Sequence, residues 1–207
     1  MIDLRHVDCM EYLAMCEDNA FELAIVDPPY GINYDGANAT SGSHGGRKAH
    51  EWKGWDKHRP SSKYWRELFR VSVHQIVWGG NYFTQHLPPS MGWVFWDKGQ
   101  RGLSMSDGEL AYTSQNRRLQ VVTINRVELM KDGTIHPTQK PVKLYEWLLM
   151  NYAEEGDRIL DTHLGSGSIA IACHNLGFDL VGCELDEDYY KGACERLERH
   201  KAQLRMF

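Results

Sequence analysis

The sequence lacks long apolar runs, paired cysteines and a basic leader. None of its 207 residues belongs to an apolar run near the roughly 18 residues that a membrane span needs. We expect no signal peptide, because residues 1–5 contain no basic segment that precedes an apolar one. The five cysteines are scattered without a C-x-x-C pair, which favours free thiols over a disulfide framework. These absences predict a cytoplasmic globular protein with no membrane partner.

Positive charge is scarce overall but concentrated in one segment. The formal net charge is −5. Between residues 45 and 70, eight lysines and arginines stand against three acids, a local charge of +5 that leaves −10 for the remainder. By charge alone, this segment suits a solvated loop and helix face as well as it suits a surface for DNA phosphates.

Apolar periodicity predicts strands that alternate with helices in a single domain over residues 1–207. Strands are expected over 2–7, 21–26, 75–78, 93–96, 109–113, 158–161 and 180–184, with 119–125 as a further candidate. Helices are expected over 8–15, 61–73, 141–152, 168–176 and 186–200. This alternation predicts a mainly parallel α/β sheet. The polar, glycine-rich residues 34–60 predict a mobile loop with a functional role.

Four residues of chemical interest, Asp27-Pro28-Pro29-Tyr30, follow the buried strand 21–26. The prolines alone would suit a rigid turn that ends the strand. An exocyclic amine, however, becomes a better nucleophile when acceptors draw on its hydrogens. The Asp27 carboxylate and the Pro28 carbonyl, held by the fixed proline φ, would be those acceptors. Tyr30 would supply a flat face for a base taken out of the DNA stack.

A glycine-rich turn over residues 161–168, between an expected strand and helix, predicts a cofactor site. Gly165 and Gly167 let the backbone approach a ligand at the helix N-terminus, and Glu184, at the end of the next strand, suits the hydroxyls of a ribose. The same spacing satisfies the dinucleotide fingerprint, so a nicotinamide cofactor and S-adenosylmethionine both fit. Asp161 favours the second, because an anion there would neutralise a methionine amino group and repel a pyrophosphate.

These segments resemble the motifs of the DNA amino-methyltransferases. Residues 27–30 are similar to the catalytic motif of the adenine-N6 type, and residues 136–141 (HPTQKP) to a second family motif. Residues 161–167 resemble the cofactor loop, with Glu184 as its ribose acid. The catalytic motif precedes the cofactor loop, which is the order of the permuted β-group.

The resemblance covers nearly the whole chain, because residues 93–98, 107–112 and part of the last helix are similar to further family segments. It implies a Rossmann-like fold of the S-adenosylmethionine-dependent methyltransferases, circularly permuted. The expected sheet is mixed, mostly parallel and seven-stranded.

By this resemblance the cofactor is S-adenosyl-L-methionine. Thr138 and Lys140 would hold its carboxylate, although Lys140 also fits a simple loop lysine before a helix. Asp8 would approach the adenine ring, cap the following helix, or do both. Where the family usually has Asp-Pro-Phe before the glycines, this chain has Asp161-Thr162-His163, which alters how the loop grips the cofactor. The full candidate set is Asp8, Asp27, His136, Thr138, Lys140, Asp161, His163, Gly165, Ser166, Gly167, Glu184 and Leu185.

The resemblance also gives the basic segment a role, since it follows the catalytic motif directly. Trp52 and Trp55 stand among its lysines, a mixture typical of strand-binding grooves, although both would also suit packing against the domain. A short target-recognition segment is expected over 115–135. No metal site is expected, because the loop histidines fit no common zinc spacing. The DNA-binding candidates are Arg47, Lys48, Lys53, Lys57, Arg117 and Arg118.

The resulting hypothesis is site-specific methyl transfer to the N6 amino group of a flipped adenine in double-stranded DNA. A homodimer and a cognate restriction endonuclease are further partners that the resemblance implies. Cytosine-N4 transfer ranks second, because family members of that type usually carry Ser in place of Asp27, and RNA as substrate ranks third. A nicotinamide-dependent oxidoreductase and an inactive DNA-binding module are rival functions. The oxidoreductase leaves residues 27–30 unexplained.

Overall fold

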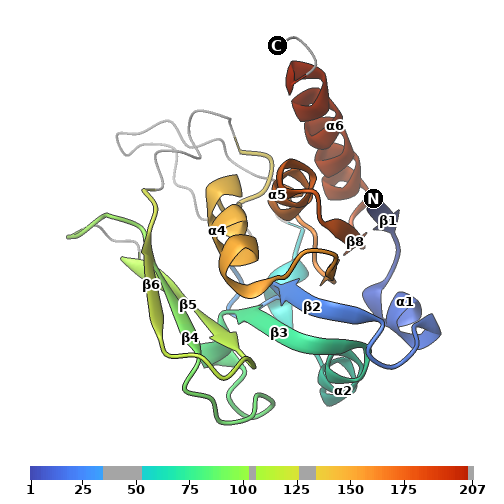
Figure 1. Ribbon diagram of the computed structural model, residues 1–207. Coiled ribbons are helices and arrows are strands. Elements are labelled where there is room, and N and C mark those ends of the chain that lie inside the picture. Colours follow the sequence, from blue (N-terminus) through green and yellow to red (C-terminus); the bar gives the residue numbers. More distant parts are fainter. Residues whose placement is uncertain (35–52, 103–105, 126–133, 205–207) are drawn as a thin grey trace.

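The computed structural model describes residues 1–34, 53–102, 106–125 and 134–204. Within them, eight strands form one sheet with helices on both faces (Figure 1). Across the sheet the strand order is β1-β8-β7-β2-β3-β5-β4-β6. Along the chain the strands are β1 (Ile2–His6), β2 (Phe21–Val26), β3 (Ser72–Trp78), β4 (Trp93–Asp97), β5 (Gly108–Thr113), β6 (Gln120–Thr123), β7 (Arg158–Asp161) and β8 (Asp179–Glu184).

Neighbouring strands pair in parallel except at β5, which runs antiparallel to both β3 and β4. The mixed, mostly parallel sheet is therefore confirmed, but the prediction of seven strands was wrong. The additional strand is β6, the outermost strand on its side of the sheet, which pairs with β4. It is only four residues long, with Val122 buried and Val121 exposed, so its apolar pattern is too short to be decisive in the sequence.

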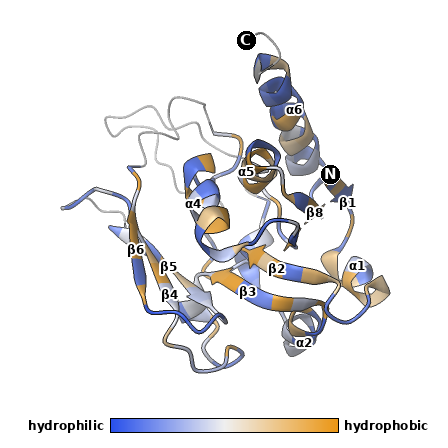
Figure 2. Cartoon of the chain, in the orientation of Figure 1, coloured by the Kyte–Doolittle hydropathy of each residue, from blue (hydrophilic) through white to orange (hydrophobic). Residues whose placement is uncertain are grey.

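Helices cover the two faces of the sheet in separate groups (Figure 1). Val26 and Val77 pack with α1 and α2, whereas Ile25 and Ile76 face α4 and α5. Because successive strand residues point to opposite faces, the last residues of β2 and β3, 23–26 and 76–78, are buried on both sides and are all apolar (Figure 2). The helices are α1 (Cys9–Met15), α2 (Ser62–Val71), α4 (Val142–Tyr152), α5 (Ser168–Leu176) and α6 (Glu187–Leu204). None of those in the described ranges is both long and apolar enough to span a membrane.

The candidate site residues gather at one edge of the sheet, where the parallel strands have their carboxyl ends. Asp27 follows β2, Asp161 ends β7 and Glu184 ends β8. Because β5 is reversed, with Trp78 opposite Ala111, it brings its first residues, including Glu109, to this same edge. We call this edge the site edge. The turn between β5 and β6 consequently lies at the opposite edge.

Candidate active site

Two cavities at the site edge share one wall. The Tyr30 cavity, of about 580 Å³, is lined by residues that follow β2 and β3 and by the start of β5. The Glu184 cavity, of about 510 Å³, lies over the ends of β1, β7 and β8. A group transferred from a molecule in one cavity to a molecule in the other would pass beside the residues that line both. The described residues that line both are Asp27, Pro29, Trp55, Thr138, Gln139 and Lys140.

Asp27 lies in this shared wall with both carboxylate oxygens engaged. The Oη of Tyr30 donates a hydrogen bond to Oδ1 at 2.7 Å, and the Nζ of Lys140 donates to Oδ2. Each carboxylate oxygen offers two lone-pair sites, so both oxygens keep acceptor capacity. Pro28 is buried and lines only the Tyr30 cavity. The three catalytic candidates thus meet at one cavity.

A buried ion network supports the Asp27 carboxylate. Lys140, only 3% exposed, also approaches Glu109 at 3.3 Å, and Lys98 approaches Glu109 at 2.6 Å. Burial by itself would raise the pKa of Glu109, but the two lysines outweigh it and lower that pKa. Burial would likewise lower the pKa of Lys140, which Asp27 and Glu109 raise instead. We expected Lys140 at the cofactor carboxylate; its amine lies between protein carboxylates.

Tyr30 forms an aromatic wall of its cavity. Its ring stacks on Tyr82 at a centroid distance of 4.8 Å and an interplanar angle of 14°, and meets Phe83 edge-on at 6.0 Å. Gly79, with φ +64°, allows this packing, because a Cβ there would lie 2.3 Å from the Tyr30 ring. Burial and the neighbouring Asp27 keep the pKa of Tyr30 well above its ordinary value, so its hydroxyl stays protonated and donates.

Glu184 holds the glycine turn at the Glu184 cavity. Its Oε2 accepts from the backbone N–H of Gly165 at 2.7 Å, and its Oε1 accepts from that of Asp186 at 2.9 Å. Gly165 has φ +53°, a backbone conformation that favours glycine, and a Cβ there would meet the His136 ring at 3.7 Å, an ordinary contact. Nine predicted cofactor residues besides Asp27 line this cavity: Asp8, His136, Thr138, Lys140, His163, Gly165, Ser166, Glu184 and Leu185.

Asp161 and Gly167 support the turn from behind and do not line either cavity. Asp161 accepts from the His163 N–H at 3.0 Å, and burial raises its pKa to about 8. Gly167 caps α5 with φ +69°, where a Cβ would lie 2.9 Å from Ala193. Asp8 accepts from the Met10 N–H at 2.8 Å as the cap of α1, and it also lines the Glu184 cavity, whereas its contact with an adenine ring stays a prediction.

His163 occupies the place where the family motif usually has an aromatic ring. Burial lowers the pKa of His163 to about 4, so its imidazole is neutral at physiological pH. The Oγ1 of Thr162 lies 2.8 Å from both the Nδ1 of His163 and the Oη of Tyr64. His163 can therefore replace the usual aromatic residue, because Thr162 and Tyr64 hold its uncharged ring against the cofactor turn.

The predicted DNA-binding residues fall into three groups. Arg47 and Lys48 lie outside the described residues. Lys57 is exposed near the site edge, whereas Lys53 bonds Asp186 and Asp188 at the mouth of the Glu184 cavity. Arg117 and Arg118 lie at the opposite edge of the sheet, where Arg117 donates to the Asn151 carbonyl at 2.6 Å. The structure thus does not bring Arg117 and Arg118 to the site.

Four residues of the site were not singled out from the sequence for the roles that the structure gives them. Lys98 and Glu109 belong to strands whose similarity to family segments was visible, but nothing in the sequence placed them beside Asp27. Trp55 was assigned to DNA or packing, and it lines both cavities. Asp56 is 2% exposed and accepts from the backbone N–H groups of Gly31, Ile32 and Tyr34. No group of three or more metal-binding side chains occurs in the described part of the chain.

Comparison with known proteins agrees with this geometry. Residues 73–195 match the family model described as DNA methylase, of the N6/N4 type. The chain is 25% identical to Type II methyltransferase M2.DpnII of Streptococcus pneumoniae, over 94% of this chain and 89% of that protein. It is 22% identical to Type II methyltransferase M.HpaI of Haemophilus parainfluenzae, over 92% of this chain and 72% of that protein.

Solved structures share the fold at low sequence identity. The M1.HpyAVI–SAM complex superposes with a TM-score of 0.63 at 17% identity, covering 95% of this chain and 99% of that one. The cytosine-N4-specific PvuII DNA methyltransferase gives 0.62 at 11% identity, covering 97% and 90%. TTHA0409 of Thermus thermophilus, complexed with S-adenosyl-L-methionine, gives 0.60 at 17% identity, covering 97% and 96%.

Proposed function

Because this chain belongs to the DNA methylase family of N6/N4 amino-methyltransferases, we propose that it methylates the N6 amino group of adenine in DNA. The observation that carries the proposal is the position of Asp27. Its carboxylate lies in the wall common to both cavities, beside the Tyr30 ring. An amine in the Tyr30 cavity and a methyl donor in the Glu184 cavity would therefore meet at this acceptor.

The Glu184 cavity fits S-adenosyl-L-methionine. That cofactor supplies an electrophilic methyl group on a cationic sulfonium. Glu184 would accept from the ribose hydroxyls, and Gly165, which has no side chain, would let the ligand approach the backbone. Burial raises the pKa of Asp161 to about 8, so its carboxyl would ionise and attract the amino group of the cofactor only when that cation lies close to it. The M1.HpyAVI and TTHA0409 structures, which share this fold, carry the same cofactor in their complexes.

Residues of the chain would prepare the adenine amine for attack. Its lone pair is delocalised into the ring, so the nitrogen is a weak nucleophile. Asp27 and the Pro28 carbonyl would accept its two hydrogens and favour a tetrahedral nitrogen. Lys140 and Tyr30 hold the Asp27 carboxylate in place beforehand, so little reorganisation is needed. The exposed part of the Tyr30 ring would stack on the flipped base.

We rank adenine above cytosine as the target base because of the residue at position 27. The family resemblance associates Asp with adenine-N6 transfer and Ser with cytosine-N4 transfer. Fold similarity gives no preference, since the cytosine-specific PvuII enzyme superposes as well as M1.HpyAVI does. Cytosine-N4 transfer is therefore the second candidate. The family match leaves the nicotinamide-dependent function without support.

Product analysis tests this proposal. The protein is incubated with plasmid DNA and methyl-labelled S-adenosylmethionine, and the DNA is digested to nucleosides. We expect label on N6-methyladenine, with none when Asp27→Ala replaces the wild type. Label on N4-methylcytosine would establish the second candidate. Equal labelling by wild type and Asp27→Ala would remove Asp27 from the mechanism.

The partners follow from the same proposal. Double-stranded DNA would approach the site edge, where Lys57 of the basic segment is exposed. The relatives named above are Type II methyltransferases, so we also propose a cognate restriction endonuclease that recognises the same site. A homodimer is proposed as the assembly. Sedimentation of the free protein and of its DNA complex would distinguish one copy from two.

A further inference from the structure

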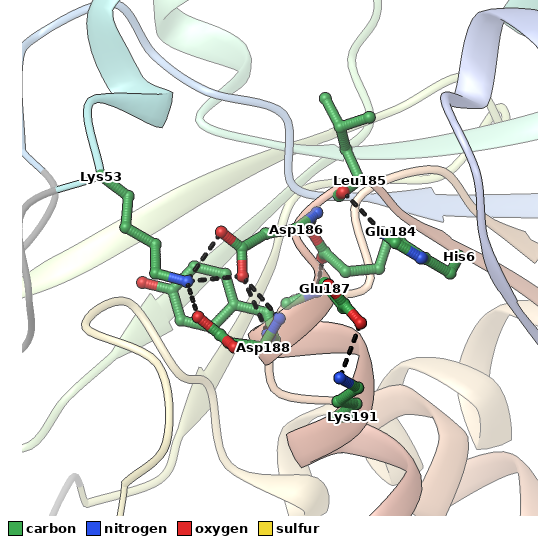
Figure 3. Close-up of polar contacts among 10 residues, drawn as sticks. His6, Lys53, Glu184, Leu185, Asp186, Glu187, Asp188 and Lys191 are labelled. Atoms are coloured by element: carbon green, nitrogen blue, oxygen red, sulfur yellow. Dashed lines mark hydrogen bonds and ion pairs between the residues drawn. The ribbon is translucent and has the colours of Figure 1, made fainter.

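Residues 53–56 run along the walls of the two cavities, and we call them the strap. At one end, the Nζ of Lys53 lies 2.6 and 2.8 Å from the two carboxylate oxygens of Asp186 and 2.7 Å from Asp188. The same amine lies over the Tyr189 ring at 4.7 Å. Figure 3 shows Lys53 reaching these acids at the start of α6, while the Glu187–Lys191 pair lies apart from it. The first contact thus joins the strap to α6.

Two further contacts hold the other end of the strap. The Trp55 ring packs against His136 at 5.2 Å, and His136 meets Tyr189 edge-on at 4.4 Å. Asp56 is buried and binds the backbone of the turn at Gly31 and Tyr34. The strap is therefore attached to α6, to the 136–141 segment and to the turn after the catalytic motif. Contacts from both sides of the site therefore fix the position of the strap.

Trp55 occupies a place in the site that its neighbours do not share. It lines both cavities, whereas Lys53 lines only the Glu184 cavity and Asp56 only the Tyr30 cavity. Methyl transfer requires donor sulfur, methyl carbon and acceptor nitrogen in line, so the transfer point must lie where the cavities meet. Among the described residues that line both cavities, Trp55 is the one with an aromatic ring.

We propose that Trp55 is a cofactor-contacting residue whose indole face stabilises the cationic sulfonium, with Lys53 as the residue that positions it. This proposal rests on the proposed function. An aromatic face attracts a desolvated cation but has no such attraction for a neutral thioether. The two amines that line the Glu184 cavity are paired, Lys53 with Asp186 and Lys140 with Asp27. Trp55 would hence hold the cofactor more tightly than its demethylated product and favour product release.

Cofactor binding without DNA tests the contact. Calorimetric titration gives the affinities for S-adenosylmethionine and for S-adenosylhomocysteine, which lacks the charge. In Trp55→Leu we expect the preference for the sulfonium form to fall about two- to thirtyfold, the range of a cation–π contact. Trp55→Phe should keep most of that preference. Circular dichroism and thermal melting establish that each variant folds.

The outcomes separate contact from simple packing. An equal loss of both affinities in Trp55→Leu, or no loss of either, would overturn the proposal. A wild-type protein that binds neither ligand would instead refute the proposed cofactor. A wild-type protein that binds both but labels cytosine would leave the Trp55 role intact and change only the target base.

Lys53→Ala tests the positioning role, with Lys191→Ala as the matched control. Both lysines pair with acids near the start of α6, but Lys191 contacts Glu187 and lines neither cavity. Because Lys53 positions Trp55, its loss should lower the preference for the sulfonium form in the same direction as Trp55→Leu does, while Lys191→Ala leaves that preference unchanged. Wild-type affinities in Lys53→Ala would show that the strap does not depend on this lysine.

Discussion

The Oη of Tyr30 donates to Oδ1 of Asp27 at 2.7 Å, three residues back along the same turn. Lys140 meets the other carboxylate oxygen. A hydroxyl and an ammonium therefore fix the plane of the Asp27 carboxylate from two sides. The proposed acceptor of the substrate amine is already oriented in the free protein.

Replacing Asp27 with Asn should abolish most activity and leave the shape of the site. The amide keeps one acceptor oxygen but places an NH₂ group toward Tyr30 or Lys140, so both the charge and one acceptor are lost. We expect kcat to fall roughly 10²- to 10³-fold, as on removal of one preorganised transition-state contact. Initial rates at saturating DNA and cofactor give this value. A fall below tenfold would mean that Asp27 is not the principal acceptor.

Glu109→Gln should destabilise the fold, because it leaves the amines of Lys98 and Lys140 with one partner fewer in a buried place. We expect a loss of about 3 kcal/mol in the free energy of unfolding, the lower end for a broken buried pair, since the Glu109 side chain is 27% exposed. Urea unfolding measures it. Glu187→Gln, which breaks the exposed pair with Lys191, should have no measurable effect. If the two variants have equal free energies of unfolding, the buried ion network does not stabilise the fold as proposed.

The raised pKa of Asp161 predicts that the free energy of unfolding depends on pH in a distinctive way. Burial raises its folded-state pKa to about 8, whereas the unfolded carboxyl titrates near its ordinary value of about 3.9. Between these values the folded state binds the extra proton, so this group makes folding progressively less favourable as pH rises from about 4 to about 8. His163 acts in the opposite direction from about pH 6.5 down to its lowered pKa of about 4.

Asp161→Asn isolates that effect. The difference in unfolding free energy between variant and wild type should change in favour of the variant as pH rises through this window and should be constant above it. Chemical denaturation at a series of pH values measures the difference. A difference that does not vary with pH would show that Asp161 titrates normally in the folded protein.

DNA binding should depend on the site edge of the sheet and not on the opposite edge. Lys57→Glu changes an exposed charge beside the cavities and should weaken DNA binding several-fold while reducing its salt dependence. The double variant Arg117→Glu and Arg118→Glu changes charges at the far edge and should leave both values near those of wild type. Fluorescence anisotropy at two salt concentrations compares them. A larger effect from the arginine pair would place DNA across the other edge.

The sequence predicted those parts of the site that follow parallel strands. Asp27 and Glu184 stand directly after apolar runs, and carboxyl ends of parallel strands meet at one edge, so their proximity followed from the pattern. Glu109 could not be found in this way, because it lies at the start of a strand. It reaches the site only because β5 runs antiparallel, and the apolar pattern of β5 does not reveal its direction.

The strap was beyond sequence reasoning for a different physical reason. Lys53 and Asp186 are 133 residues apart, and an ion pair over that separation leaves no trace in local periodicity. Local charge suggested a role for Lys53 on DNA, whereas its amine faces carboxylates of α6. The predicted number of strands was wrong because β6 has only four residues and one buried side chain, too short a pattern to be decisive.

Asp56 has a consequence for how such a protein could be altered. Its carboxylate accepts a hydrogen bond from the N–H of Tyr34, the last residue that the structure describes before residue 53. Asp56 lies three residues beyond residue 53, where the described part of the chain resumes. Two residues that are 22 positions apart in the chain are thus held together, so the residues between them could be exchanged or lengthened without moving Asp27. Tyr34 and Asp56 are therefore a suitable pair of junctions for inserting a foreign segment, and the proposed function makes the DNA sequence that is methylated the property to measure.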